Sequence, residues 1–573
     1  MIEDAEVLVA GAGIAGALIA HQLSRAGVPV TIVDAGDRAY FDPATGADQR
    51  AELVRRFFTA PVKTTNSAFP NLAAAPSPDE GALNAYFVER GPAPFQSTYL
   101  RMVGGTTYHW LGTALRYTPN TFAERTRFGR GADWPFGYDE LEPWYWRAEQ
   151  ELGVAGDGAA DLGSPRAPGQ GYPMPPVPAS YNDQLVMAAT EGLCVDGLPV
   201  EFRSTPQARN TTFYQGRPAC AGSANCIPIC PIGAKYDASV HLLRALNPAL
   251  DPDSPPGARP ARLLTGLTVS RVLVGPDGQV GGVAVRAPGE DERVLTARRY
   301  VLALNAIENA KVLLCSATES LPRGVANSSD AVGRYLMDHD VKISYARLPR
   351  PAYLFRGPLS TAGVESMRDG DFRSRRAAFR IELQNTGWSW AAGAPFTDVA
   401  ALVNQGLTGE RLRQAVAWQV NTQIELNGLI EPEPNPDNRV LPSATLRDAL
   451  GIPRPELFYS IGQYSIDGAA AFWTAVRAVY ARLGATEVAE VPGWQGAGHL
   501  MGTHRMGTDP AGSVCDGYGR SHDHPNLFLT GSGLFPTVDA ANPTLTIAAV
   551  ALRTAAHLIA TRAGDRAAGA ERS

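Results

Sequence analysis

The chain has 573 residues, with 57 acidic and 51 basic side chains and a formal net charge of -6 at pH 7. It offers no basic field for nucleic acid, so no nucleic-acid partner is expected. No run of about 18 apolar residues occurs, so no direct membrane anchor is expected, and the length indicates at least two lobes because one hydrophobic core rarely serves so long a chain.

The first element along the chain is a nucleotide-binding pattern. A short apolar run leads into Gly11-x-Gly13-x-x-Gly16, an amphipathic helix beginning near Ile14, and a second apolar run that ends in Asp34. Gly11 permits a tight turn, Gly13 lets the backbone approach a pyrophosphate, and Gly16 lets helix and strand pack closely. Asp34 is placed to accept hydrogen bonds from an adenosine ribose. The order therefore predicts a βαβ dinucleotide site.

Three further segments follow this unit. A polar passage rich in Pro and Ala, over about 60–90, indicates an exposed loop. Gly104 and Gly105, beside small hydroxyl residues, predict a turn whose backbone N–H groups approach an anionic ligand, unless the segment is an ordinary loop. Helical spacing over 138–152, with acids in the first turn, predicts a packing helix.

The second half of the chain alternates between two patterns. Segment 263–285 reads as a hairpin, and 299–305 is a buried strand followed by a helix over 306–317, which indicates a return to the nucleotide domain. Longer polar-alternating segments over 340–490 predict strands and helices of a second lobe. A short strand over 527–531 and a helix over 543–560 close the pattern.

Four separated motifs resemble the GMC (glucose-methanol-choline) family of flavoprotein oxidoreductases over essentially the full length. They are the N-terminal Gly-x-Gly-x-x-Gly, Val103-Gly-Gly-x-x-x-His109-Trp110, His499-x-x-Gly-Thr-His504-Arg-Met-Gly followed by Gly531-Ser-Gly-Leu-Phe-Pro, and Asn542-Pro-Thr-Leu-Thr. The resemblance implies that the dinucleotide is FAD. It also implies an α/β fold in which a Rossmann-like FAD-binding domain is joined to an α+β, sheet-based substrate domain.

The resemblance further implies the division into domains. The discontinuous FAD-binding domain is expected over 1–60, 90–150, 200–340 and 495–573, and the substrate-binding or cap domain over 61–89, 151–199 and 341–494.

Two branches of the family look closest. Segments 104–110, 134–145, 217–220 and 325–330 resemble the flavoprotein subunits of fructose, sorbitol and gluconate dehydrogenases. The segments around His504 and Asn542 resemble pyranose oxidases and bacterial glycoside 3-oxidases. Both branches imply FAD-dependent oxidation of a secondary hydroxyl of a sugar, glycoside or polyol to a ketone.

Such an oxidation needs a base within about 3 Å of the hydroxyl while a hydride leaves for flavin N5. The resemblance gives His499 that place, with Asn542 as the partner that holds the substrate oxygen. His504 is a weaker candidate, for contact with flavin or with the interface between lobes. The resemblance also gives cofactor contacts at Gly104, Gly105, His109, Gly531, Asn542 and Thr544.

His109 carries an open question. In pyranose oxidases and several sugar dehydrogenases, the histidine of the matching motif is joined covalently to the flavin 8α-methyl, and the alternative is that His109 merely lines the pocket. A covalent bond would fix the ring and tend to raise its reduction potential.

The spacing Cys220-x5-Cys226-x3-Cys230-Pro231 raises a second open question. Three thiolates can ligate an iron-sulfur cluster, which would imply electron export to an electron-transfer subunit. The alternative is three uncoordinated thiols, with reoxidation by oxygen or a quinone. The six cysteines are too few and too unevenly placed for a disulfide scaffold, and no secretory leader is evident, so a cytoplasmic location is expected, with export alongside a partner subunit left open.

Two functions outside this class each account for part of the sequence. A non-catalytic flavin-binding subunit would need neither a base at His499 nor an amide at Asn542. An NAD(P)-linked dehydrogenase would account for the N-terminal unit but not for the C-terminal motifs. Both are therefore less favoured than a flavin-dependent oxidoreductase.

Overall fold

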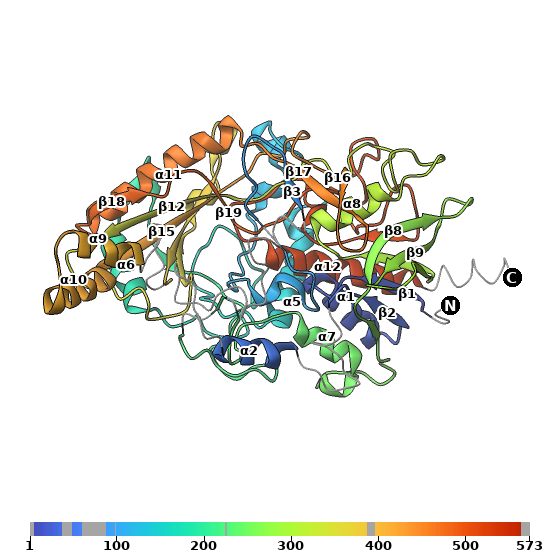
Figure 1. The fold of residues 1–573 in the computed structure, drawn as a ribbon, viewed down its shortest axis with the longest axis horizontal. Coiled ribbons are helices and arrows are strands. Elements are labelled where there is room, and N and C mark those ends of the chain that lie inside the picture. Colours follow the sequence, from blue (N-terminus) through green and yellow to red (C-terminus); the bar gives the residue numbers. More distant parts are fainter. Residues whose placement is uncertain are drawn as a thin grey trace.

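A computed structural model describes residues 5–36, 49–59, 87–97, 99–223, 226–227, 229–386 and 396–562. Figure 1 shows two lobes side by side. Most of the loop expected over 60–90 lies outside the described residues.

The first lobe is built on a parallel sheet with strand order β20-β11-β1-β2-β7. Its strands are β1 (Val7–Ala10), β2 (Val30–Val33), β7 (Arg262–Leu264), β11 (Arg299–Leu302) and β20 (Leu527–Leu529). Most of these strand residues are apolar and buried because both faces of the sheet are covered. The parallel pairing of β1 with β11 confirms the predicted return of the chain to the nucleotide domain.

Helices cover one face of this sheet and a mixed layer covers the other. Alternate residues such as Val9 and Val301 pack on α1 (Ile14–Arg25), α7 (Ser239–Leu246) and α12 (Thr544–Ala560). Their neighbours in the strands share a core with α5 (Tyr138–Leu152), α8 (Ala306–Cys315) and the antiparallel strands β8 (Thr268–Val274), β9 (Val280–Arg286) and β10 (Arg293–Leu295). The predicted hairpin over 263–285 and the helices over 138–152 and 306–317 are thereby confirmed within a few residues.

The second lobe is built on a seven-stranded sheet with order β18-β12-β15-β14-β13-β6, and β19 pairs with β12. Its strands are β6 (Arg203–Ser204), β12 (Asp340–Arg347), β13 (Ala362–Val364), β14 (Phe379–Gln384), β15 (Gln423–Ile430), β18 (Thr486–Glu490) and β19 (Gln495–Gly496). The long helix α11 (Gln463–Arg482) and α6 (Tyr181–Thr190) pack on one face.

Alternation along β14 and β15 gives this second sheet two different faces. Phe379, Ile381 and Leu383 join Leu426 in the core shared with α11. The residues between them, among them Glu382, turn toward the first lobe. One strand therefore supplies both an apolar core and a polar wall.

The expected boundaries of the substrate domain need two adjustments. Strand β16 (Arg439–Arg447) pairs with β17 (Pro453–Phe458), which in turn pairs with β3 (Val88–Glu89), and β16 and β17 pack on α8 of the first lobe although they lie within 341–494. Val440 and Leu457 bury their side chains in the first lobe's core, which explains this placement. In the other direction, β6 pairs with β13 of the second sheet, although 200–340 was expected in the nucleotide domain.

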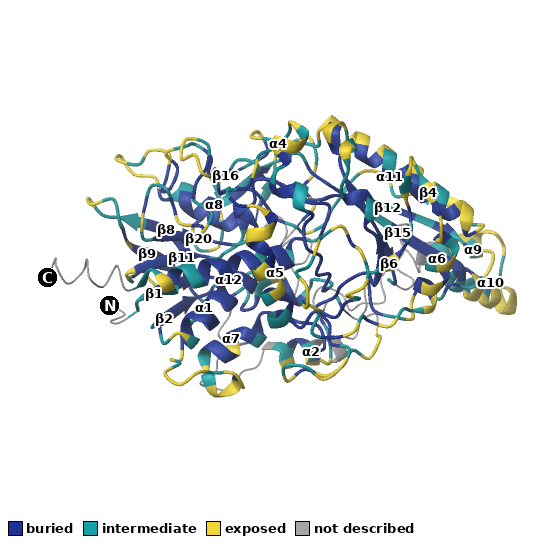
Figure 2. Cartoon of the chain, turned by 180° about the vertical axis from the view of Figure 1, so that it is seen from behind, coloured by how far each residue is buried: buried dark blue, intermediate teal, exposed yellow. Residues whose placement is uncertain are grey.

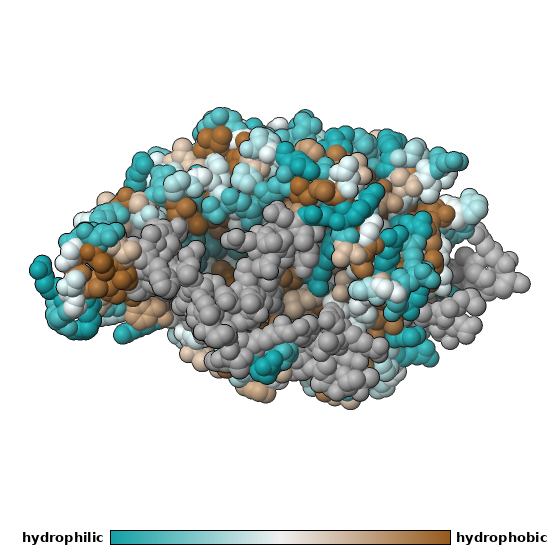
Figure 3. All heavy atoms as spheres, in the orientation of Figure 1, coloured by the Kyte–Doolittle hydropathy of each residue, from teal (hydrophilic) through white to brown (hydrophobic). Residues whose placement is uncertain are grey.

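The remaining helices and strands are peripheral. They are α2 (Gln49–Thr59), α4 (Glu124–Phe128), α9 (Phe396–Asn404), α10 (Gly409–Thr422), β4 (Cys194–Val195) and β5 (Leu198–Pro199). Figure 3 shows apolar atoms at the far end of the second lobe, where α9 and α10 lie and Trp418 is exposed. Figure 2 shows buried residues running through both sheets and exposed ones on the outer loops. None of the described helices is long and apolar enough to cross a membrane.

Candidate active site

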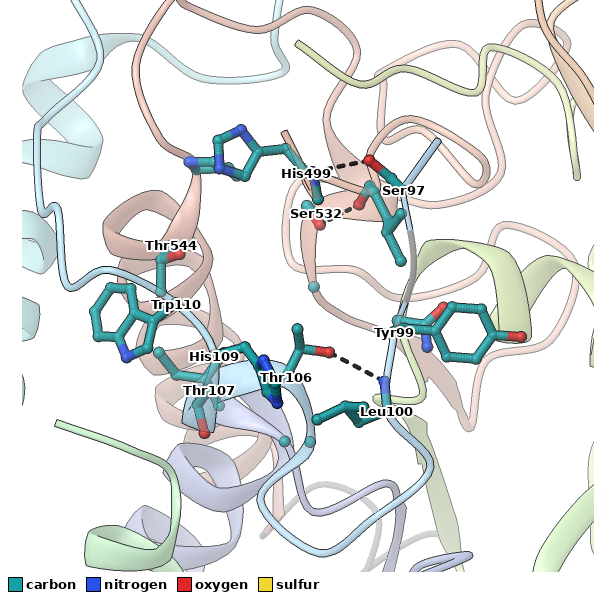
Figure 4. A pocket seen from close by; sticks show the side chains of 18 of the residues that line it. Ser97, Tyr99, Leu100, Thr106, Thr107, His109, Trp110, His499, Ser532 and Thr544 are labelled. Carbon is teal, nitrogen blue, oxygen red and sulfur yellow. Dashed lines mark hydrogen bonds between the residues drawn. The ribbon is translucent and has the colours of Figure 1, made fainter. Parts of the chain in front are cut away.

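A cavity of about 690 Å³ is lined by residues of both lobes. The first lobe contributes the glycine turn after β1, the loop over 96–113 and the C-terminal motifs, and the second contributes β12, β14 and β15. Figure 4 shows His499 on one side of this space and His109, Trp110 and Thr107 across from it. The volume lies within the range of about 300–1,000 Å³ that is usual for ligand pockets.

The nucleotide end of the cavity is a backbone surface. Gly11 has φ +100° and leads to Gly13, where α1 begins without a side-chain cap. A Cβ on Gly13 would meet no protein atom within 4 Å, whereas one on Gly16 would lie 2.0 Å from the Gly11 carbonyl oxygen. Gly13 therefore leaves space for a ligand at the positive end of the helix, and Gly16 serves close packing.

Asp34 directly follows β2 and lies in the wall of the same cavity. Its Oδ2 accepts from the Ala12 N–H at 2.8 Å and its Oδ1 from the Gly36 N–H at 2.7 Å. Burial raises the pKa of Asp34, and these two donors oppose the rise. Each carboxylate oxygen has a second lone pair, so acceptor capacity remains for a ribose hydroxyl. The open Gly13 position and this carboxylate fit FAD.

The loop that carries His109 is held against the glycine turn. Gly104 and Gly105 have φ +85° and +56°, and the Gly104 N–H donates to the Ala12 carbonyl at 3.2 Å. Gly105 and His109 line the cavity, as do Gly531 and Thr544, whereas Gly104 stands behind this wall. The predicted turn is present, and its glycines bring two separate loops to one nucleotide site.

His499 and Asn542 both line the cavity. Burial, followed by the neighbouring His339 and Arg380, holds the pKa of His499 well below its usual value. The Asp338 carboxylate accepts the His499 backbone N–H at 2.9 Å. Burial raises the pKa of Asp338 to about 7. His499 is therefore neutral near pH 7 and rests on a fixed backbone.

His339 makes two short ring contacts at this place. Its Nε2 lies 2.6 Å from the Asp539 carbonyl oxygen and its Nδ1 lies 2.8 Å from His499 Nδ1. Burial lowers the pKa of His339 to about 4. Sequence reasoning missed this residue because it stands 160 positions from His499 and no spacing pattern marks it.

Asn542 is oriented by the second lobe. Its Oδ1 accepts from Arg380 Nη1 at 3.2 Å, and Arg380 is paired with two carboxylates, Glu365 and Glu382. Glu382 lines the cavity beside two amide side chains that come from β14 and β15, Gln384 and Asn427. Sequence reasoning missed this wall, although the polar alternation along β14 could have indicated it.

His504 has a different place. It is fully buried, does not line the cavity, and its Nε2 lies 3.1 Å from Asn309 Nδ2. Its backbone N–H donates to the Gly533 carbonyl at 2.9 Å. The structure thus gives His504 a packing position behind the site rather than a contact with it.

The three cysteines lie in the loop that brings Ile227 to the cavity wall. Cys226 is buried, and Cys220 and Cys230 are half-buried. Burial raises the pKa of Cys220, and the nearby thiols of Cys226 and Cys230 add to the rise. Three free thiols in one loop are the donor type that an iron-sulfur cluster takes, and uncoordinated cysteines are the alternative.

A buried lysine ties this loop to the His109 loop. Lys235 Nζ donates to the carbonyls of Tyr108 at 2.7 Å, Cys226 at 2.9 Å, and Trp110. Its pKa is lowered to about 8 by burial, against the opposing effect of the thiols. The cysteine loop and the wall around His109 therefore form one connected unit.

The parallel sheet with its glycine turn and the second sheet with its polar wall define a two-lobed nucleotide-binding protein that has a ligand cavity lined by both lobes. Residues 434–551 match the model of the GMC oxidoreductase family. The chain is 33% identical over 561 residues to the fructose dehydrogenase large subunit of Gluconobacter japonicus, with 96% of this chain and 97% of that protein covered. The chain therefore belongs to the GMC oxidoreductase family.

Two other similarities agree with this assignment. The 6'''-hydroxyparomomycin C oxidase of Streptomyces lividus is 31% identical over 583 residues, covering 98% of this chain and 93% of that one. A solved structure of Aspergillus oryzae formate oxidase, from work on its FAD modification, matches with a TM-score of 0.60 at 15% identity and covers 98% of both chains. Family membership confirms the predicted fold class and the predicted oxidoreductase, and it implies FAD as the cofactor.

Proposed function

We propose that the protein oxidises a secondary hydroxyl of a sugar, glycoside or polyol to a ketone, with His499 as the base. The observation that carries this proposal is that His499 and Asn542 line the same cavity as the nucleotide turn at Gly13. FAD, when bound, accepts the hydride that leaves the carbinol carbon. Gly11, Gly13, Asp34 and Thr544 would hold the cofactor.

His499 and Asn542 have different roles in the proposed reaction. His499 is neutral at working pH because its pKa is lowered, so it can take the hydroxyl proton. Asn542 accepts from Arg380 through Oδ1 and donates one Nδ2 hydrogen to Glu382, so its second Nδ2 hydrogen can donate to the substrate oxygen without adding charge. Together they hold the oxygen and remove its proton.

The polar wall supports a substrate rich in hydroxyls. Glu382, Gln384 and Asn427 offer both acceptors and donors at the cavity, and among the described residues Asn427 Oδ1 has no hydrogen-bond partner. The relatives named above act, by their names, on fructose and on an aminoglycoside. A sugar, glycoside or polyol is the substrate class that fits both observations.

For reoxidation we propose two routes that differ in the cysteine loop. In the first, oxygen or a quinone takes the electrons directly and the thiols are empty. In the second, the chain is the flavoprotein subunit of an electron-transferring dehydrogenase, and Cys220, Cys226 and Cys230 hold an iron-sulfur cluster. The link through Lys235 to the His109 loop and the similarity to a dehydrogenase large subunit favour the second route.

An anaerobic reduction screen tests the proposed function. FAD-loaded protein is mixed with neutral sugars, glycosides, polyols and sugar acids, and loss of the oxidised flavin spectrum is followed. Reduction by at least one polyhydroxylated compound, with a ketone as the product, is expected. A protein that binds FAD but is reduced by none of them would be the non-catalytic flavin subunit instead.

A further inference from the structure

We propose that His339 is a positioning residue, which fixes the ring tautomer of His499 and leaves Nε2 of His499 as the proton acceptor. The inference rests on the proposed role of His499 as base. It assigns a task to a buried histidine that contacts the base and does not itself line the cavity.

The first step concerns the proton on His339. A carbonyl oxygen can only accept a hydrogen bond, so the 2.6 Å contact with the Asp539 carbonyl requires a hydrogen on His339 Nε2. A neutral imidazole carries one ring hydrogen. His339 is fully buried and neutral, so its Nδ1 is a bare lone pair.

The second step transfers this constraint to His499. Its Nδ1 lies 2.8 Å from His339 Nδ1, and the two rings stand nearly perpendicular at 89°. Two lone pairs facing each other at that distance would repel, so the hydrogen between them belongs to His499 Nδ1. Because neutral His499 also carries one ring hydrogen, its Nε2 is the nitrogen without one.

The third step follows the proton during the reaction. The substrate O–H bond breaks and an Nε2–H bond forms, while the Nδ1–H of His499 stays in place and donates to His339. The resulting imidazolium thus gains a charge-assisted hydrogen bond that the neutral ring could make only weakly. A charged His339 would lower the pKa of His499, but the pKa of His339 is itself lowered to about 4 by burial, so near pH 7 its neutral lone pair offsets part of the burial that disfavours the charged His499 ring.

The other charged groups around the pair do not supply this acceptor. Asp338 is occupied by backbone N–H groups and Ser97, and the Asp539 carboxylate is paired with Arg368. Arg380 is a positive charge that opposes the imidazolium, and it carries Glu382 as its own partner. The lone pair of His339 is therefore the acceptor in contact with the His499 ring.

Two conservative variants separate the two ring contacts of His339. In His339→Asn the amide oxygen can take the place of Nδ1 and accept from His499, whereas in His339→Gln the amide nitrogen can take the place of Nε2 and donate to Asp539. His339→Leu removes both contacts. His499→Ala is made in parallel, and flavin reduction is measured anaerobically by stopped flow from pH 5 to 9 with one substrate that reduces the wild type.

The Asn variant is expected to keep most of the rate, and the Gln and Leu variants to lose at least about 10-fold, as orienting partners of catalytic histidines commonly do. In the two slow variants the acid limb of the pH profile should move to lower pH, because His499 loses its acceptor. FAD content and flavin reduction potential should stay at the wild-type values. A variant that merely disturbed the packing of the site would change them.

The outcomes separate this inference from the proposed function. Equal rates for the Asn and Gln variants, or a Gln variant faster than the Asn variant, would overturn the positioning role of His339. That comparison stands even if the Leu variant does not fold. A wild-type rate in His499→Ala would overturn the proposed function itself, whereas a slow His499→Ala beside an unaltered His339→Gln would overturn the present inference alone.

Discussion

Arg380 Nη1 donates to Asn542 Oδ1 across 3.2 Å and so joins β14 of the second lobe to the segment just before α12 of the first, two residues ahead of its first residue Thr544. The two residues are 162 positions apart. This contact spans the lobes at the cavity and fixes which end of the amide can donate to a ligand. The Asn542 amide is thus oriented by the second lobe rather than by its neighbours along the chain.

Replacing Asn542 tests this arrangement. Asn542→Ala should slow flavin reduction by about 10² to 10³, the usual worth of a donor to a developing oxyanion, with FAD still bound. Asn542→Asp should be at least as slow, because it can accept from Arg380 but adds a charge and has no donor. The rate of flavin reduction is measured by stopped flow. An Asn542→Asp variant at the wild-type rate would show that the hydrogen bond donated by the amide is irrelevant.

Replacing the two C-terminal histidines should give different defects. His499→Ala should lower the rate of flavin reduction by about 10² to 10⁴ and leave FAD bound, because a positioned base is lost. His504→Ala should lower the melting temperature, since a buried side chain is removed, while the rate per bound flavin stays close to wild type. The reverse pattern would mean that the base has been assigned to the wrong histidine.

The same base predicts the pH dependence. A base works when it is unprotonated, so the rate is present above its pKa and lost as pH falls through it. The ordinary pKa of histidine is about 6.5. Because the pKa of His499 is lowered, the rate of flavin reduction in the wild type should stay level as the pH falls through that ordinary value. A decline centred on that ordinary value would contradict the desolvated position of His499.

Two glycine variants should separate cofactor binding from folding. Gly13→Val should fold and lose FAD, because a Cβ at this position meets no protein atom within 4 Å and would enter the space beside the helix end. Gly16→Val should lower stability even without FAD, because its Cβ would lie 2.0 Å from the Gly11 carbonyl oxygen. Visible flavin absorbance and far-UV circular dichroism melts, compared with wild-type apoprotein, measure the two effects.

The linkage at His109 is tested by denaturation. If His109 is joined to the flavin, acid-precipitated wild-type protein should remain yellow, and His109→Ala should release FAD into the supernatant. A colourless wild-type pellet would limit His109 to lining the cavity, where the structure places it. The fold and the proposed base are unaffected by either result.

The iron content of the purified protein tests whether the cysteine loop holds a cluster. Protein made under anaerobic, iron-replete conditions should contain roughly three irons per flavin if the three thiolates hold a cluster. Cys226→Ser should then lose the iron and slow electron transfer to an external acceptor more than flavin reduction. Cys194→Ser, at an exposed cysteine outside the loop, is the matched control. Iron-free wild-type protein that is reoxidised by oxygen or quinone would support direct reoxidation.

Part of the fold and part of the candidate site could be predicted from the sequence, because these parts depend on residues that are neighbours along the chain. The turn at Gly11 and Gly13, the helix that follows and the acid at Asp34 form within a short segment, and their spacing fixes their chemistry. The motif that carries His499 likewise marked a residue of the cavity wall. The alternation of apolar and polar residues along β14 is also a local pattern, and it indicates the polar cavity wall that sequence reasoning missed.

The packing of the two lobes decided the contacts between residues that are far apart in the sequence. Periodicity shows that a strand has a polar and an apolar face, but not which distant residue each face will meet. The burial of β16 and β17 against α8, the contact between His339 and His499, and the bond from Arg380 to Asn542 all join segments far apart in the sequence. The sequence by itself determined the fold class and the cofactor turn, and the tertiary structure decided the environment of the base, because desolvation and ring contacts exist only once both sheets are packed.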